Sequence, residues 1–284
     1  MATRHNPNKP DGYDPIALTR AAERVVVKGN KRKYARLSRP LRFYGGITSA
    51  QEVGCNLRCK FCFSDKPVRR PHSTGNFYTP QQVFDALEKG AKKHGHKLIS
   101  ASASEGTLGR EHLFELLELV EQSDLIYVLE TNGITLGNDP DYVYELARFR
   151  NLHVRVSIKG TTPKEYVKLT GAKSDSYDLP YKALEYLIDG KVSCNACLMI
   201  SFSTEMDIRY AEQRLYRVWP GLLKSLEKEH ITLFPKVATR LANASLAPRT
   251  IRNKGKIKKD KGRLTDILTK EKGKWKYLAW SESK

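Results

Sequence analysis

The amino-acid sequence predicts an α/β protein that folds as an open, partial (β/α)6 barrel. Two observations predict this fold. Six short apolar segments recur about every 30 residues, and each of them except the last is followed by a stretch with helical periodicity. Such alternation is typical of a parallel sheet with right-handed crossovers. In a barrel of this kind the functional groups lie on the loops that follow the carboxyl ends of the strands.

The first half of the barrel contains the clearest helix start. Thr79 can cap a helix, Pro80 suits its first turn, and Gln82 completes a capping box. The apolar residues that follow recur on one helix face. The predicted strands are 45–54, 97–103 and 125–133, and the predicted helices start at 80, cover 110–122, and run from Asp139-Pro140 to about Phe149.

The second half of the barrel repeats this pattern. Residues 152–160 alternate like a strand, and Thr162-Pro163-Lys164-Glu165 repeats the capping signature. The remaining predicted strands are 193–203 and 230–235, and the remaining helices follow Pro180 and cover 209–219. These units complete six strands.

The net charge of +19 is concentrated at the two ends of the chain. Residues 1–46 contain 11 Lys and Arg against 3 Asp and Glu, residues 236–284 contain 15 against 4, and residues 47–235 contain 24 of each. We therefore expect a core at 47–235 between a basic N-terminal extension and a basic C-terminal extension. Such ends favour an anionic partner such as nucleic acid, although solvated tails would have the same composition.

The composition also bounds the class of protein. No apolar run of about 18 residues is present, which predicts no transmembrane helix, and no membrane partner is expected. The first residues lack the apolar segment of a secretory signal, so we expect a cytoplasmic protein. In a reducing compartment, five cysteines indicate metal binding or chemistry more than a disulfide framework.

Three of the five cysteines stand together after the first predicted strand. Cys55, Cys59 and Cys62 have the spacing C-x3-C-x2-C. Cysteine thiolates suit zinc and iron–sulfur clusters, and a structural zinc site takes four protein ligands. A [4Fe–4S] cluster with three protein ligands would leave one iron open to a small molecule. The spacing therefore leaves a zinc knuckle and an iron–sulfur site as alternatives.

Residues 55–62 resemble the cluster loop of radical S-adenosylmethionine (SAM) enzymes in cysteine spacing and in the aromatic Phe61 before the third cysteine. The resemblance implies that the cysteines are metal ligands for a [4Fe–4S] cluster and that SAM binds the fourth iron. It also implies reductive cleavage of SAM to a 5′-deoxyadenosyl radical, which abstracts hydrogen from a substrate. A reductant such as ferredoxin or flavodoxin would supply the electron.

Three later strand ends extend the resemblance. Residues 102–107 stand where the family has a Gly-Gly-Glu segment, with Glu105 at the glutamate and Ala103 and Ser104 at the glycines. Residues 130–133 and 157–160 resemble strand ends of the activating-enzyme branch. The SAM contacts that the resemblance implies are Phe61, Ser104, Glu105, Thr131, Asn132, Ser157 and Lys159.

The substrate is not named by these motifs, and three functions are expected as alternatives. The first is a radical SAM enzyme for which RNA, in particular transfer RNA, is a candidate substrate. The second is an activating enzyme that installs a glycyl radical on a partner protein. The third is a non-enzymatic nucleic-acid-binding protein that a metal stabilises. The pair Cys194 and Cys197 is interpreted as core cysteines, because residues three apart on a strand face opposite sides.

Overall fold

The computed structural model describes residues 12–253, 256–259, 268–271 and 274–277. Its main sheet contains six parallel strands in the order in which they follow along the chain. They do not close into a complete barrel, so the prediction of an open, partial (β/α) barrel is confirmed. The strands are β4 (Ile47–Glu52), β6 (Leu98–Ser102), β7 (Ile126–Thr131), β8 (Leu152–Ile158), β9 (Cys194–Met199) and β10 (Glu227–Glu229).

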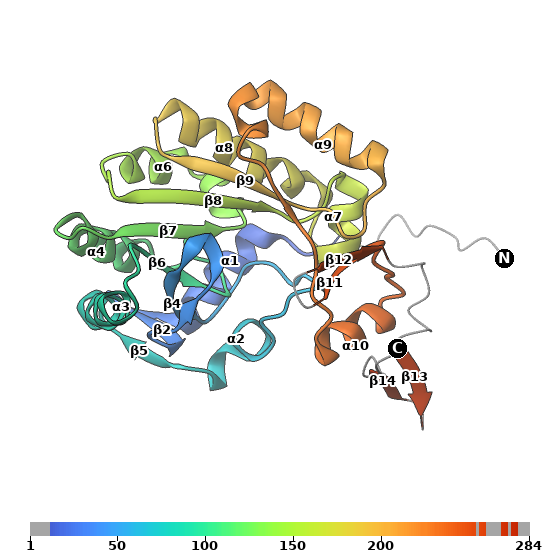
Figure 1. Ribbon diagram of the computed structural model, residues 1–284, viewed down its shortest axis with the longest axis horizontal. Coiled ribbons are helices and arrows are strands. Elements are labelled where there is room, and N and C mark those ends of the chain that lie inside the picture. The colour runs from blue at the N-terminus through green and yellow to red at the C-terminus, as the bar shows by residue number, and fades with distance from the viewer. Residues whose placement is uncertain (1–11, 254–255, 260–267, 272–273, 278–284) are drawn as a thin grey trace.

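Helices between the strands cover the outer side of the curved sheet (Figure 1). The predicted capping box is present: the Thr79 hydroxyl accepts a hydrogen bond from Gln82 N, and the Gln82 side chain accepts one from Thr79 N. These helices are α3 (Pro80–His94), α4 (Arg110–Glu121), α5 (Ile134–Asn138), α6 (Pro140–Leu146), α7 (Pro163–Thr170), α8 (Leu179–Asp189) and α9 (Glu205–Val218). Two short 3-10 helices, η3 (Ser174–Asp178) and η4 (Pro220–Leu223), accompany them.

The two faces of the sheet differ in chemistry. On β7, Tyr127 and Leu129 are buried in the apolar core, whereas the alternate position holds Glu130. On β8, Val154 and Val156 alternate in the same way with Arg155. Each fully buried apolar side chain contributes about 1.5–3 kcal/mol, so the helix-facing side stabilises the fold. The opposite side remains available for polar groups.

Residues before β4 extend the sheet. Strand β2 (Lys31–Arg36) pairs antiparallel with β4, and Tyr34 lies opposite Glu52. Tyr34 is only 1% exposed, and its hydroxyl contacts the ring of His112 at 2.8 Å. Tyr34 therefore lies in the apolar core. The other elements here are α1 (Pro15–Val26), β1 (Val27–Lys28), β3 (Pro40–Leu41), η1 (Phe43–Gly45), α2 (Lys66–Arg69), η2 (Pro71–Ser73) and β5 (Asn76–Tyr78).

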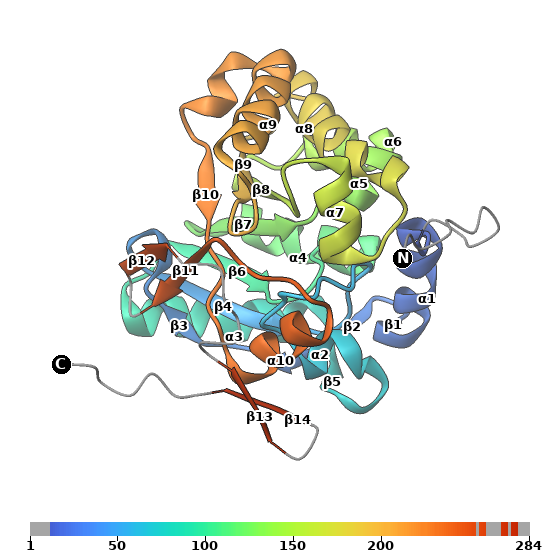
Figure 2. The same ribbon diagram turned by 90° about the vertical axis from the view of Figure 1, so that its right-hand side faces the viewer.

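The end of the sheet differs from the predicted strand at 230–235. The last parallel strand is three residues earlier, and Pro235 begins helix α10 (Pro235–Asn243), as suits a proline in a first helical turn. Helix α10 lies beside α2 in both views (Figures 1 and 2). Beyond it are β11 (Thr250–Asn253), β12 (Lys256–Lys259), β13 (Leu268–Glu271) and β14 (Lys274–Tyr277). Trp280 lies outside the described residues. Within the described part of the chain, no helix combines the length and apolarity needed to span a membrane.

Candidate iron–sulfur and S-adenosylmethionine site

The three clustered cysteines lie on one loop between β4 and α2. Cys59 is buried, and Cys55 and Cys62 are half-buried. In the described part of the chain, no three His, Cys, Asp or Glu side chains converge on a point where one metal ion would sit. A [4Fe–4S] cluster does not need such convergence, because each cysteine binds a different iron. One loop thus supplies the three thiols that the spacing predicts.

Two arginines hold the backbone of this loop. Arg240, from α10, donates to the carbonyls of Lys60 (3.1 Å) and Cys62 and forms an ion pair with Asp65 at 2.9 Å. Arg69, from α2, donates to the carbonyl of Cys59 at 2.9 Å. Because these carbonyls have charged hydrogen-bond donors as partners, the backbone that carries Cys59 and Cys62 is held in place.

The charges around the loop suit an anionic ligand set. Burial raises the pKa of Cys59 to about 12, and the Lys159 ammonium opposes that rise. Burial also raises the pKa of Cys62, and a hydrogen bond with the Ser64 backbone and the cation of Lys159 oppose that rise. Metal binding displaces thiol protons, and neighbouring cations favour the resulting thiolates. The donors and their surroundings therefore fit a [4Fe–4S] cluster.

Glu105 is the centre of a hydrogen-bond network at the ends of β6 and β7. It is buried, and its carboxylate accepts hydrogen bonds from the hydroxyls of Thr107 (2.8 Å) and Thr131 (2.5 Å). It also accepts a hydrogen bond from the backbone N–H of Asn132 at 2.9 Å. These bonds fix the carboxylate as a hydrogen-bond acceptor, the role expected of a group that binds the amino group of SAM.

Asn132 connects this network to the cysteine loop. Its side-chain amide donates to Asn56 Oδ1 at 2.6 Å and contacts the sulfur of Cys55 at 3.8 Å. Its carbonyl oxygen accepts a hydrogen bond from Ile134 N at 3.0 Å, at the start of α5. The structure thus brings together Glu105, Asn132 and Cys55, which come from three different strand ends.

The remaining predicted SAM contacts are more dispersed. The Ser104 hydroxyl donates to the carbonyl of Glu52 at 2.9 Å. Phe61 is buried with its ring 6.0 Å from that of Phe202. At the end of β8, the Ser157 hydroxyl accepts a hydrogen bond from Arg155 at 3.1 Å. Lys159 lies 3.8 Å from Glu229. Ser104 and Ser157 already have partners within the protein, whereas Lys159 lies close enough to influence the cysteine thiols.

Sequence reasoning missed a polar network beside Ser157. The Arg155 guanidinium donates to Glu227 at 3.0 Å and to the sulfur of the fully buried Cys197 at 2.7 Å. Asn195 also donates to Glu227, at 2.8 Å. The alternation of 152–160 places Arg155 on the face opposite the apolar residues. This position was the signal in the sequence that could have indicated a polar network on that face. Cys194 is half-buried and packs against the core. Both cysteines of this pair lie on β9 and not on the cysteine loop.

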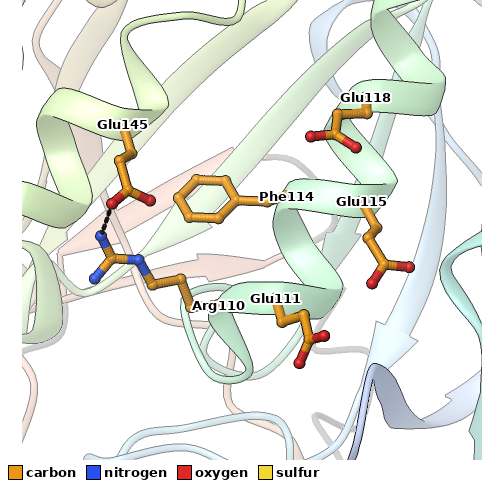
Figure 3. A pocket seen from close by; sticks show the side chains of 6 residues that line it. All are labelled: Arg110, Glu111, Phe114, Glu115, Glu118 and Glu145. Atoms are coloured by element: carbon orange, nitrogen blue, oxygen red, sulfur yellow. Dashed lines mark ion pairs between the residues drawn. The ribbon is translucent and has the colours of Figure 1, made fainter.

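A separate pocket of about 470 Å³ lies on α4 and α6 (Figure 3). Four of its side chains are acidic, and Arg110 forms an ion pair with Glu145 at 2.8 Å. The lining residues are Arg110, Glu111, Phe114, Glu115, Glu118 and Glu145. None of them belongs to the predicted site, so this pocket is not part of it.

An open parallel sheet with three cysteines after its first parallel strand defines a class of iron–sulfur enzymes that use SAM. The sequence model of the radical SAM superfamily matches residues 53–213. The chain belongs to this superfamily, whose cofactors are a [4Fe–4S] cluster and SAM, as the sequence predicted. Reductive cleavage of SAM is the reaction that gives this superfamily its name. No curated protein matches the chain.

Solved structures of radical SAM enzymes share the fold at low identity. A mutant of spore photoproduct lyase with bound AdoMet and dinucleoside spore photoproduct is 16% identical, with a TM-score of 0.51 over 81% of this chain and 67% of that chain. Streptococcus suis SuiB bound to S-adenosylmethionine is 16% identical, with a TM-score of 0.47 over 67% of this chain and 51% of that chain. Across three SuiB structures, the match covers 35%, 51% and 50% of the SuiB chain.

Proposed function

We propose that the protein is a radical SAM enzyme in which Cys55, Cys59 and Cys62 hold a [4Fe–4S] cluster. The observation that carries this proposal is the contact of Asn132 with both the cysteine loop and Glu105. It connects the cluster ligands with the acceptor expected for SAM. When bound, the two cofactors supply reductive SAM cleavage and hydrogen abstraction from a substrate.

The side chains would divide the binding of SAM according to charge. The Glu105 carboxylate would accept a hydrogen bond from the ammonium group through Oε2, because this oxygen has two lone pairs and accepts only from Asn132 N, whereas Oε1 accepts from Thr107 and Thr131. Lys159 would pair with the SAM carboxylate. Phe61 would lie against the adenine, and Ser104 and Ser157 would contact SAM by rearranging their present hydrogen bonds.

Reductive SAM cleavage tests this proposal directly. The protein is reconstituted anaerobically with iron and sulfide and incubated with SAM and dithionite, and 5′-deoxyadenosine is quantified. We expect its formation in the wild-type protein and none in Cys59→Ala. Cys194→Ala is the matched control, because it removes a cysteine outside the loop and should leave turnover within about twofold. Equal 5′-deoxyadenosine formation by Cys59→Ala and the wild-type protein would contradict the proposal.

RNA is the substrate class that the charge distribution favours. In the division of the chain at 47 and 235, both extensions are basic. Within the N-terminal extension, Arg36 and Arg42 are exposed, and the ring of Phe43, which follows Arg42, is 56% exposed. Exposed cations bind phosphates, and an exposed aromatic ring can stack on a base.

Binding of transfer RNA across a salt series tests the substrate class. Affinity should fall steeply between 50 and 200 mM salt, by about tenfold or more, because counterions are released from phosphates. Arg42→Glu should weaken binding, and Glu118→Gln on α4 is the control. Absence of binding at low salt excludes RNA. A glycyl-radical EPR doublet on a co-purified protein would instead identify an activating enzyme.

A further inference from the structure

Arg32, on β2, is a buried cation that donates hydrogen bonds to the carbonyls of a backbone turn. Its side chain is 1% exposed and forms an ion pair with Glu52 at 3.0 Å. The guanidinium also donates to the carbonyls of Glu105 (2.6 Å), Gly106 (3.1 Å) and Leu108 (2.5 Å). The planar fork of an arginine can reach several acceptors in this way, whereas a lysine ammonium is a single point charge.

The turn that Arg32 holds has a strained backbone. Ala103 has a φ of 70°, in the left-handed region where a residue with a Cβ is strained. Glycine, which has no Cβ, adopts this conformation without that strain. A strained turn persists only when surrounding contacts determine it, so Ala103 requires an external restraint.

The same turn connects the SAM-binding carboxylate to the cysteine loop. Glu105 N donates to the carbonyl of Gly54 at 3.1 Å, next to Cys55. Gly106 lies so close to β7 that an added Cβ would be 2.8 Å from the carbonyl oxygen of Glu130. A shift of the turn would therefore displace Glu105 relative to both the cysteine loop and the end of β7.

We propose that Arg32 is a positioning residue for SAM binding: from β2 it fixes the strained turn at 103–108 and thereby the carboxylate of Glu105. The proposal rests on the proposed function, because Glu105 is there assigned to SAM. It gives the strand before the barrel a role in the site. It also explains how Ala103 keeps a left-handed backbone, since Arg32 supplies the restraint that the turn sequence lacks.

Arg32→Lys is the informative variant, because it keeps a cation for Glu52 but loses the fork that binds three carbonyls. We expect the SAM dissociation constant of the reconstituted protein, measured by equilibrium dialysis, to rise by about fivefold or more. Amide hydrogen exchange at 104–108 should become faster even without SAM. Arg150→Lys, the same substitution at an exposed position before β8, should leave both measurements within about twofold of wild type.

Ala103→Gly separates positioning from general stability. It removes the strain, so in the Arg32→Lys background it should restore SAM affinity to within about twofold of wild type. In the wild-type background it should change affinity little. If Arg32→Lys unfolds the protein, the same comparison is made with Ala103→Gly present in every variant, where Arg32→Lys should lower SAM affinity by no more than about twofold.

Three outcomes decide the proposal. Recovery of affinity and of turn protection by Ala103→Gly supports it. Wild-type affinity and exchange in Arg32→Lys, or a loss that Ala103→Gly does not recover, would overturn it. Faster exchange of the turn without any loss of SAM affinity supports Arg32 as the residue that positions the turn, but contradicts the assignment of Glu105 to SAM, so the two failures are distinguishable.

Discussion

The carboxylate of Glu105 accepts a hydrogen bond from the backbone N–H of Asn132 at 2.9 Å. This bond joins the ends of two neighbouring parallel strands, β6 and β7. Asn132 in turn reaches the cysteine loop through Asn56, at 2.6 Å. Residues 27 positions apart in the chain thus form one polar network. Substitution of Glu105, Asn132 or Asn56 should therefore alter the hydrogen bonds of the other two residues, so the network can be tested by substitution.

Removing one cysteine of the loop should abolish the iron–sulfur site. Because three thiolates from one loop are expected to hold the cluster, Cys62→Ser should reduce bound iron and sulfide after anaerobic reconstitution to less than about a tenth of the wild-type amount. Cys197→Ser is the control, since this thiol bonds to Arg155 and lies outside the loop. Equal loss of iron in both variants would argue against the loop as the ligand source.

Glu105→Gln should weaken SAM binding with little change in the amount of cluster. The substitution keeps the size of the side chain but replaces one of the two carboxylate oxygens with an NH₂ group, which cannot accept a hydrogen bond. Thr131 and Asn132 donate to different oxygens of Glu105, so one of the two bonds is lost. We expect an increase of about tenfold in the SAM dissociation constant, consistent with loss of a charge-assisted contact. Glu118→Gln, an exposed pair with Arg148, is the control. Wild-type affinity in Glu105→Gln would exclude the assigned role.

The sequence was sufficient to predict five of the six parallel strands, because their signals are local. The capping residues Thr79 and Gln82 and the cysteine spacing are read within a few positions. The restraints on the site could not be predicted in this way. Arg240 binds the carbonyl of Lys60 across 180 residues, and Arg32 binds carbonyls more than 70 residues away. Neither contact leaves a periodic pattern, because a single charged residue is compatible with both a buried and an exposed position.

His112 should make the folded state sensitive to acid. Burial lowers its pKa to about 4 from an ordinary value of 6.5. The ring is held neutral: Nδ1 donates to the carbonyl of Asn30 at 2.7 Å, and Nε2 accepts from the Tyr34 hydroxyl at 2.8 Å. Between pH 6.5 and 4 the unfolded chain therefore binds a proton that the folded protein does not, and the stability contributed by neutral His112 is lost as pH falls.

The size of this effect follows from the displacement of the pKa. A pKa lowered from 6.5 to about 4 corresponds to about 3 kcal/mol of unfolding free energy between pH 7 and pH 4. The measurement is urea unfolding at both pH values for wild type and His112→Gln, which cannot titrate. The wild-type protein should lose more stability on acidification than the variant. Parallel losses in the two proteins would show that His112 does not carry this dependence.

Arg240 should determine how long a bound cluster survives in air. It is mostly buried and holds two carbonyls of the cysteine loop as well as Asp65. Lys236, on the same helix, also pairs with Asp65, but its side chain is 65% exposed. An exposed ion pair contributes little to stability, with a median of about 0–1 kcal/mol, whereas loss of Arg240 leaves loop carbonyls without a partner.

In Arg240→Gln, the iron–sulfur absorbance should therefore bleach in air about threefold or more faster than in the wild-type protein. Lys236→Gln should bleach at nearly the wild-type rate, and faster bleaching in that variant alone would show that the surface pair, and not the arginine, restrains the loop.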